Sequence, residues 1–160
     1  VIAGALRGAA EGDPAAAERM ALGQYVAGMG YSNVGLGLVH AMAHPLGAFY
    51  SAPHGVANGI LLAPVMAFNA EATGEKFRDI AAAFGVDVSG MSTEAARTAA
   101  VDAVAALTRD LGNPVTLREI GAKESDIPAL AQAAFDDVCA GGNPRPATVA
   151  EIEELYRALY

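Results

Sequence analysis

The stretch that decides the fold of this chain runs from Gly35 to Asn58 and reads GLGLVHAMAHPLGAFYSAPHGVAN. Its first half predicts a helix over residues 33–44, because aliphatic residues recur there on most sides of a helical wheel. Pro45 lacks a backbone N–H, so we expect it to end this helix together with Gly47. Residues 49–53 are then predicted to form a connecting loop.

All three histidines of the chain lie in this stretch, at His40, His44 and His54. His40 and His44 are spaced i and i+4, so both project from one face of the first helix. His54 follows a proline at the start of the next helix, and a turn between the helices could bring it beside His40. Imidazole suits zinc, iron and copper. The alternative is that each histidine is an ordinary core or surface residue, since neither Glu18 nor Glu71 is spaced to complete a metal site.

Helical patterns also fill the rest of the chain, and no segment shows the period-2 alternation of a strand. Polar residues mark several helix starts, and Thr148 with Glu151 has the spacing of a capping box. The other start signals are Asp13 before Pro14, Ser92 and Ser125. Together these patterns predict helices over residues 15–28, 54–69, 73–84, 92–111 and 126–140, with a short one over 116–120 and a last one after Thr148. We expect one all-α, helical bundle-like domain over residues 1–160.

The composition excludes several classes of protein. Hydrophobic residues make up 53% of the 160 residues, which is too apolar for a disordered chain. A net charge of −8 leaves no basic surface for nucleic acid or for anionic lipid. The longest apolar run, Gly55–Ala67, is too short to cross a bilayer and contains Pro64. We therefore expect no nucleic-acid partner and no membrane partner.

Two further features bear on the cellular compartment and on the length of the protein. The single cysteine, Cys139, excludes an internal disulfide and suits a reducing cytoplasm. We expect this cysteine to be a small buried apolar residue on a helix. Val1–Leu6 is interpreted as the end of a helix that begins earlier, so the chain is expected to be a truncated form of a longer protein.

The quoted stretch resembles the signature of the iron-containing (group III) alcohol dehydrogenases, which reads Gly-x-x-His, then Ala-His-x-x-Gly, then Pro-His-Gly. The similarity continues through Met20–Asn33, Gly74–Ile80 and Asp126–Arg145 and so covers essentially the whole chain. The resemblance implies two domains, an N-terminal α/β domain that binds NAD(P) and a C-terminal helical domain that binds a metal. Only the second matches this sequence, so the N-terminal domain is expected to be absent.

The same resemblance implies roles for individual residues. In the family one Asp and three His bind the metal, and two of those histidines match His40 and His54. The Asp and the remaining His belong to a helix that precedes this sequence. His44 matches a histidine near the nicotinamide that is not a metal ligand, so it is the candidate to relay the alcohol proton. Tyr31 matches an aromatic position that lines the same cleft, and Phe49 is a second candidate for a pocket wall. For both aromatic residues the alternative is ordinary core packing.

The implied function is metal-assisted hydride transfer between small alcohols or diols and the corresponding aldehydes. The expected cofactors are Fe²⁺, with Zn²⁺ possible, and NAD(P) bound mainly by the absent domain. The intact enzyme is expected to be a homodimer, and this part alone is expected to be inactive. One alternative is a non-catalytic helical module used for association. Another is a related enzyme of the same architecture, such as a zinc-dependent glycerol dehydrogenase or a lyase similar to dehydroquinate synthase; the Pro53-His54-Gly55 context favours the iron type.

Overall fold

A computed structural model describes residues 1–160 and confirms the all-helical fold class. It contains α-helices and short 3₁₀ helices and no strand. The α-helices are α1 (Ile2–Ala10), α2 (Pro14–Val34), α3 (Leu38–Tyr50), α4 (His54–Asn69), α5 (Lys76–Ala83), α6 (Thr93–Asp110), α7 (Ile127–Phe135) and α8 (Val149–Ala158). The 3₁₀ helices are η1 (Ala70–Thr73), η2 (Arg118–Ile120), η3 (Glu124–Asp126) and η4 (Val138–Gly142).

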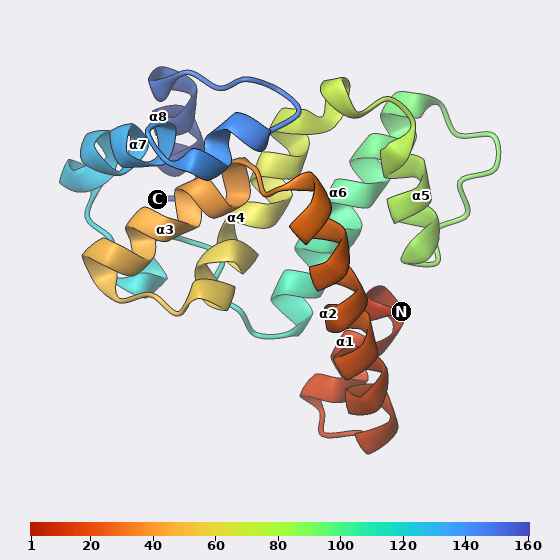
Figure 1. The fold of residues 1–160 in the computed structure, drawn as a ribbon. Helices are drawn as coiled ribbons and strands as arrows, with labels where there is room; N and C mark the ends of the chain where they lie inside the picture. The colour runs from red at the N-terminus through yellow and green to blue at the C-terminus, as the bar shows by residue number, and fades with distance from the viewer.

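The helices form a packed body and a hairpin that leaves it (Figure 1). In the body α3 packs against α4 and α7, α7 packs against α8, and α6 lies between α4 and α5. Helices α1 and α2 pack chiefly against each other, and Figure 1 shows them extending away from the body. One ion pair fixes the hairpin to α6, with Nη2 of Arg7 2.7 Å from a carboxylate oxygen of Asp110.

The main core lies where α3, α4, α7 and α8 meet. Its fully buried side chains include Met42 and Leu46 from α3, Leu61 from α4, and Leu130 from α7. Tyr156 of α8 is also fully buried, and its hydroxyl donates a hydrogen bond of 2.6 Å to the carbonyl oxygen of Met42. The buried polar atom is therefore satisfied, and it connects the last helix directly to the helix that carries His40 and His44.

Several predicted helix starts are confirmed. The Asp13 carboxylate accepts hydrogen bonds from the N–H groups of residues 15 and 16, and Pro14 occupies the first turn of α2. The Ser92 hydroxyl caps α6. Thr148 and Glu151 form the predicted capping box of α8. Helix α4 covers residues 54–69, as its pattern predicts.

The predicted end of the histidine helix was wrong. Helix α3 continues through Pro45 and Gly47 to Tyr50. A proline inside a helix removes one backbone hydrogen bond. Here Pro45 and the next residue, Leu46, are both buried in the core, and this burial offsets the loss. The helix ends at Ser51, whose φ of 54° is left-handed and whose N–H bonds the carbonyl oxygen of Gly47.

Other boundaries also differ from the predictions. Helix α2 runs on to Val34 and ends at Gly35, whose φ is 82°, so α3 begins at Leu38 and not at residue 33. The predicted helix over 126–140 stops at Phe135, and residues 138–142 form η4 instead. Ser125 does not cap this helix, because its hydroxyl bonds the Asp126 side chain. The predicted helix over 73–84 is shorter, spanning Lys76–Ala83. None of the helices combines the length and the apolar composition that crossing a bilayer requires.

Candidate metal and cofactor site

The three histidine rings lie together at the corner between α3 and α4. The ring centroids of His40 and His54 are 5.4 Å apart, and those of His44 and His54 are 5.5 Å apart. His40 and His44, on one face of α3, are separated by 6.3 Å. The structure therefore brings together the residues that the sequence singled out, as expected from a sharp turn between two packed helices.

The corner itself fixes where His54 lies. Ser51 turns the chain by adopting the left-handed conformation, and Ala52 is buried beneath the turn. Pro53, with φ of −56°, then occupies the N-cap position of α4. Because α3 and α4 pack along each other, the first residue of α4 lies beside the middle turns of α3. His54 therefore lies next to both histidines of α3.

The surroundings of His40 favour its neutral form. Burial lowers the pKa of His40, and the neighbouring rings of His54 and His44 lower it further, although Asp137 acts in the opposite direction. A neutral imidazole has a free lone pair on one nitrogen, which is the form that binds a metal ion. The pair His40 and His54 can thus offer two nitrogen ligands of a kind that suits Fe²⁺ and Zn²⁺.

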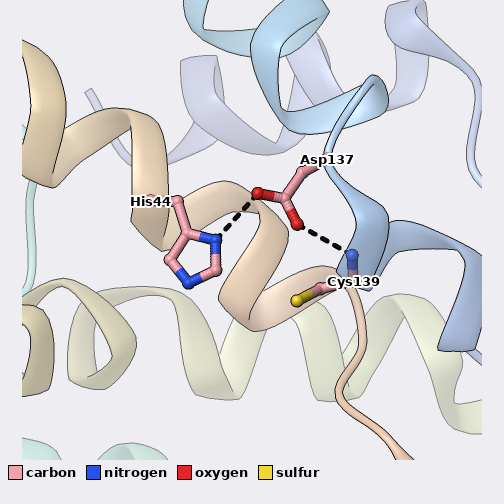
Figure 2. Close-up of side chains that lie close together, drawn as sticks. All are labelled: His44, Asp137 and Cys139. Atoms are coloured by element: carbon pink, nitrogen blue, oxygen red, sulfur yellow. Dashed lines mark hydrogen bonds and ion pairs between the residues drawn. The ribbon is translucent and has the colours of Figure 1, made fainter.

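His44 faces a carboxylate that the sequence analysis missed. Its Nδ1 lies 2.8 Å from one oxygen of Asp137, at the start of η4, as Figure 2 shows. The other oxygen of Asp137 accepts a hydrogen bond of 2.8 Å from the backbone N–H of Cys139. Burial opposes ionisation of Asp137, but the hydrogen bonds from His44 and Cys139 outweigh it and lower the pKa of this carboxyl overall. With Asp137 ionised, Nδ1 of His44 carries a proton and, in the neutral ring, Nε2 is left as the acceptor.

One protein family matches the full length of the chain. The model of the Fe-containing alcohol dehydrogenase family, C-terminal, matches residues 1–160. The chain belongs to the Fe-containing alcohol dehydrogenase family. The resemblance predicted from the histidine signature is confirmed.

Individual members of the family agree with this assignment. The chain is 68% identical to the lactaldehyde reductase of Escherichia coli K12 over 160 residues, covering 100% of this chain and 42% of that protein. It is 46% identical to the 1,3-propanediol dehydrogenase of Citrobacter freundii over 145 residues, which are 91% of this chain and 38% of that protein. The crystal structure of a 1,3-propanediol oxidoreductase superposes with a TM-score of 0.97 at 43% identity, covering 99% of this chain and 42% of that one. The chain thus spans well under half the length of these relatives.

An open cleft of about 900 Å³ adjoins two of the three histidines of this family member. His40 and His54 line it. Tyr31 also lines it, on the side that the end of α2 forms. Tyr31 is 53% exposed, so it is not a core residue. Phe49 does not line this cleft, and the prediction that it forms a wall was wrong. It lies beyond His44 near the end of α3, exposed and beside Tyr50.

Asn143 holds one wall of the cleft in place and was also missed. Its Oδ1 accepts from the N–H of Leu38 at 3.2 Å and from Nδ2 of Asn69 at 2.9 Å. Its Nδ2 donates to Oδ1 of Asn69 at 2.7 Å and to the carbonyl oxygen of Arg145. One side chain therefore joins the start of α3, the end of α4 and the loop after η4. Its only sequence signal is the Asn-Pro of a loop, which predicts a turn and not a cleft wall.

Proposed function

We propose that this chain is the metal-binding catalytic domain of an NAD(P)-dependent alcohol dehydrogenase that interconverts small alcohols or diols and aldehydes. The observation that carries the proposal is the convergence of His40 and His54, with ring centroids 5.4 Å apart, at the edge of a cleft that Tyr31 also lines. Relatives named lactaldehyde reductase and 1,3-propanediol dehydrogenase support substrates of the small-diol type. The dinucleotide is bound mainly by an N-terminal α/β domain, which is the direct partner of this one, and the intact enzyme is a homodimer.

His40 and His54 bind a divalent metal ion, Fe²⁺ or alternatively Zn²⁺, through one nitrogen each. The ligand set is completed by an aspartate and a third histidine. Both belong to the part of the relatives' length that this chain does not span. When held by these residues, the ion would supply Lewis-acid polarisation of the substrate oxygen. The chain's own contribution is to hold the two imidazoles at fixed positions, because both helices that carry them are packed into the core.

His44 handles the alcohol proton in this proposal. Asp137 holds the proton on Nδ1, so Nε2 of His44 is the atom available to accept a proton and pass it to solvent. The His44 side chain is 41% exposed, which gives it access to water. Tyr31 contributes an apolar wall for the nicotinamide or the substrate. In this proposal His44 and Tyr31 face the cofactor, because Tyr31 lines the cleft and His44 lies beside His54, which also lines it.

The ligand assignment and the proton assignment are tested together in the intact enzyme. His40→Ala and His54→Ala should lose bound metal, measured by elemental analysis, and lose turnover of propanediol. His44→Ala should keep the ion bound by His40 and His54 and slow turnover by about 10²–10⁴-fold, the usual range for a general acid–base group. Phe49→Ala is the matched control and should keep both. Wild-type metal content in His54→Ala would remove the ligand assignment.

A further inference from the structure

A second group of potential metal ligands is formed by His44 and two residues at the start of η4. His44, Asp137 and Cys139 each offer one ligand atom, and these atoms all lie within 4.8 Å of one another. The group contains an imidazole nitrogen from α3 and, from the start of η4, a carboxylate oxygen and a thiol sulfur. In Figure 2 the sulfur lies on the side of Cys139 that faces the imidazole ring. Cys139 lies on the 3₁₀ helix η4, as the predicted helical position requires, but it is only partly buried, so its predicted full burial was wrong.

The backbone holds two of these ligands in a fixed relation. Oδ1 of Asp137 accepts the N–H of Cys139, so one tight turn sets the carboxylate and positions the sulfur two residues later. The Asp137 side chain is only 18% exposed. His44 approaches from α3, and its side chain is 41% exposed. Two of the three ligands are therefore positioned by the backbone before any ion binds, and the third is partly open to solvent.

The donor set selects the kind of cation. Hard cations such as Mg²⁺ and Ca²⁺ require several oxygen ligands, and this group offers one carboxylate. Nitrogen, oxygen and sulfur donors together suit Zn²⁺ and related thiophilic ions in a tetrahedral site with one position left for water. Such a site separates neighbouring donor atoms by about 3.3–3.7 Å. The 2.8 Å between Nδ1 of His44 and the Asp137 oxygen has to open by about half an ångström, and the other ligand atoms, which all lie within 4.8 Å of one another, have to close by up to about 1 Å.

We propose that His44, Asp137 and Cys139 form a binding site for a thiophilic divalent cation such as Zn²⁺, separate from the site of His40 and His54. Burial and the neighbouring Asp137 raise the pKa of Cys139, so the free thiol is protonated. On binding, the thiol releases its proton to solvent and the neutral ring of His44 changes tautomer, its proton moving from Nδ1 to Nε2, so that the sulfur and Nδ1 lone pairs bond the ion. No oxidant or other reactant takes part. An ion here replaces the hydrogen bond between His44 and Asp137 with two metal–ligand bonds.

Cd²⁺ is the probe that tests this site, because cadmium bound to a thiolate gives an ultraviolet charge-transfer band. Cys139 is the only cysteine in the 160 residues, so the band reports on this position alone. Titration of the chain should saturate the band at one Cd²⁺ per chain, and Zn²⁺ should displace it. Cys139→Ser should abolish the band with unchanged helical circular dichroism.

The other ligands distinguish a built site from a thiol that binds cadmium by itself. Asp137→Asn and His44→Ala should each weaken Cd²⁺ binding by at least about tenfold, since even changes behind a metal ligand have effects of that size. His40→Ala, which removes a ligand of the other site, should leave the band and its midpoint unchanged. Equal affinity in the wild type, Asp137→Asn and His44→Ala would overturn the proposal, and so would the absence of any band at stoichiometric Cd²⁺. Neither result would bear on metal binding by His40 and His54, which produces no thiolate band.

Discussion

The hairpin of α1 and α2 and the packed pair of α3 and α4 are both helical, yet they are held in place by different means. Helix α2 is 21 residues long and buries only two of them, Ala16 and Gly23. Helix α3 is 13 residues long and buries six, including Met42 and Leu46. The hairpin is therefore held by local capping, by its own two-helix contact and by the ion pair of Arg7 with Asp110, while the pair of α3 and α4 is held by the core of the domain.

This difference separates two parts of the candidate site. His40, His44 and His54 are carried by the packed pair, where core burial restricts their positions. Tyr31 is carried by the end of α2, whose outer face exposes an apolar row at Leu22, Tyr25, Val26 and Met29. Ligands of a metal ion need precise placement, whereas a pocket wall tolerates movement. In the proposed function, the more deeply packed region therefore carries the metal ligands and the less packed one carries the pocket wall.

The largest expected effect compares leucines of the two regions. Leu46→Ala removes a side chain that is fully buried in the core and should lower the free energy of unfolding by about 2–5 kcal/mol. Leu22→Ala removes a side chain of α2 that is 59% exposed and should change it by less than about 0.5 kcal/mol. Urea unfolding followed by circular dichroism measures both. Similar decreases in the free energy of unfolding for the two variants would show that Leu22 is packed in solution and would contradict the difference between the two regions.

A smaller effect is expected from the hydrogen bonds that connect distant segments. Tyr156→Phe leaves the buried carbonyl of Met42 without its partner and should lower the free energy of unfolding by about 1–2 kcal/mol. Arg7→Ala removes the exposed ion pair with Asp110 and should lower it by less than about 1 kcal/mol. The second loss should shrink in high salt and the first should not, because salt screens exposed charges. A salt-dependent loss in Tyr156→Phe would contradict this account.

The sequence predicts the local features of the fold well, because their causes are local. The caps at Asp13, Ser92 and Thr148 each depend on a side chain bonding a backbone group two or three residues away. The extent of α3 could not be predicted in this way. Whether a helix continues past Pro45 depends on the burial of that segment against α4 and α7, which is a property of the folded domain.

The same limit applies to the candidate site. The i, i+4 spacing of His40 and His44 and the proline before His54 predict that the rings converge, and they do converge. Asp137 is 93 residues from His44, and no pattern around either residue indicates the other. The packing of α3 against η4, which only the folded domain shows, places this acid beside His44.

The smallest expected effect concerns the cap of α8 and its dependence on pH. Hydrogen bonds from the backbone N–H and hydroxyl of Thr148 lower the pKa of Glu151, and the charge of Arg145 adds to them. A carboxyl whose folded pKa is lowered stabilises the fold above its unfolded pKa, and this contribution is lost as the pH falls through the folded value. The wild type should therefore lose stability on acidification more steeply than Glu151→Gln, which keeps an acceptor oxygen but cannot titrate. Thermal unfolding of both proteins from neutral to acidic pH measures the difference between the slopes. The sign of the slope difference is the test, because the other carboxylates titrate alike in both proteins and their contributions cancel in the difference. A steeper loss of stability in Glu151→Gln would show that the charged form of Glu151 does not stabilise α8.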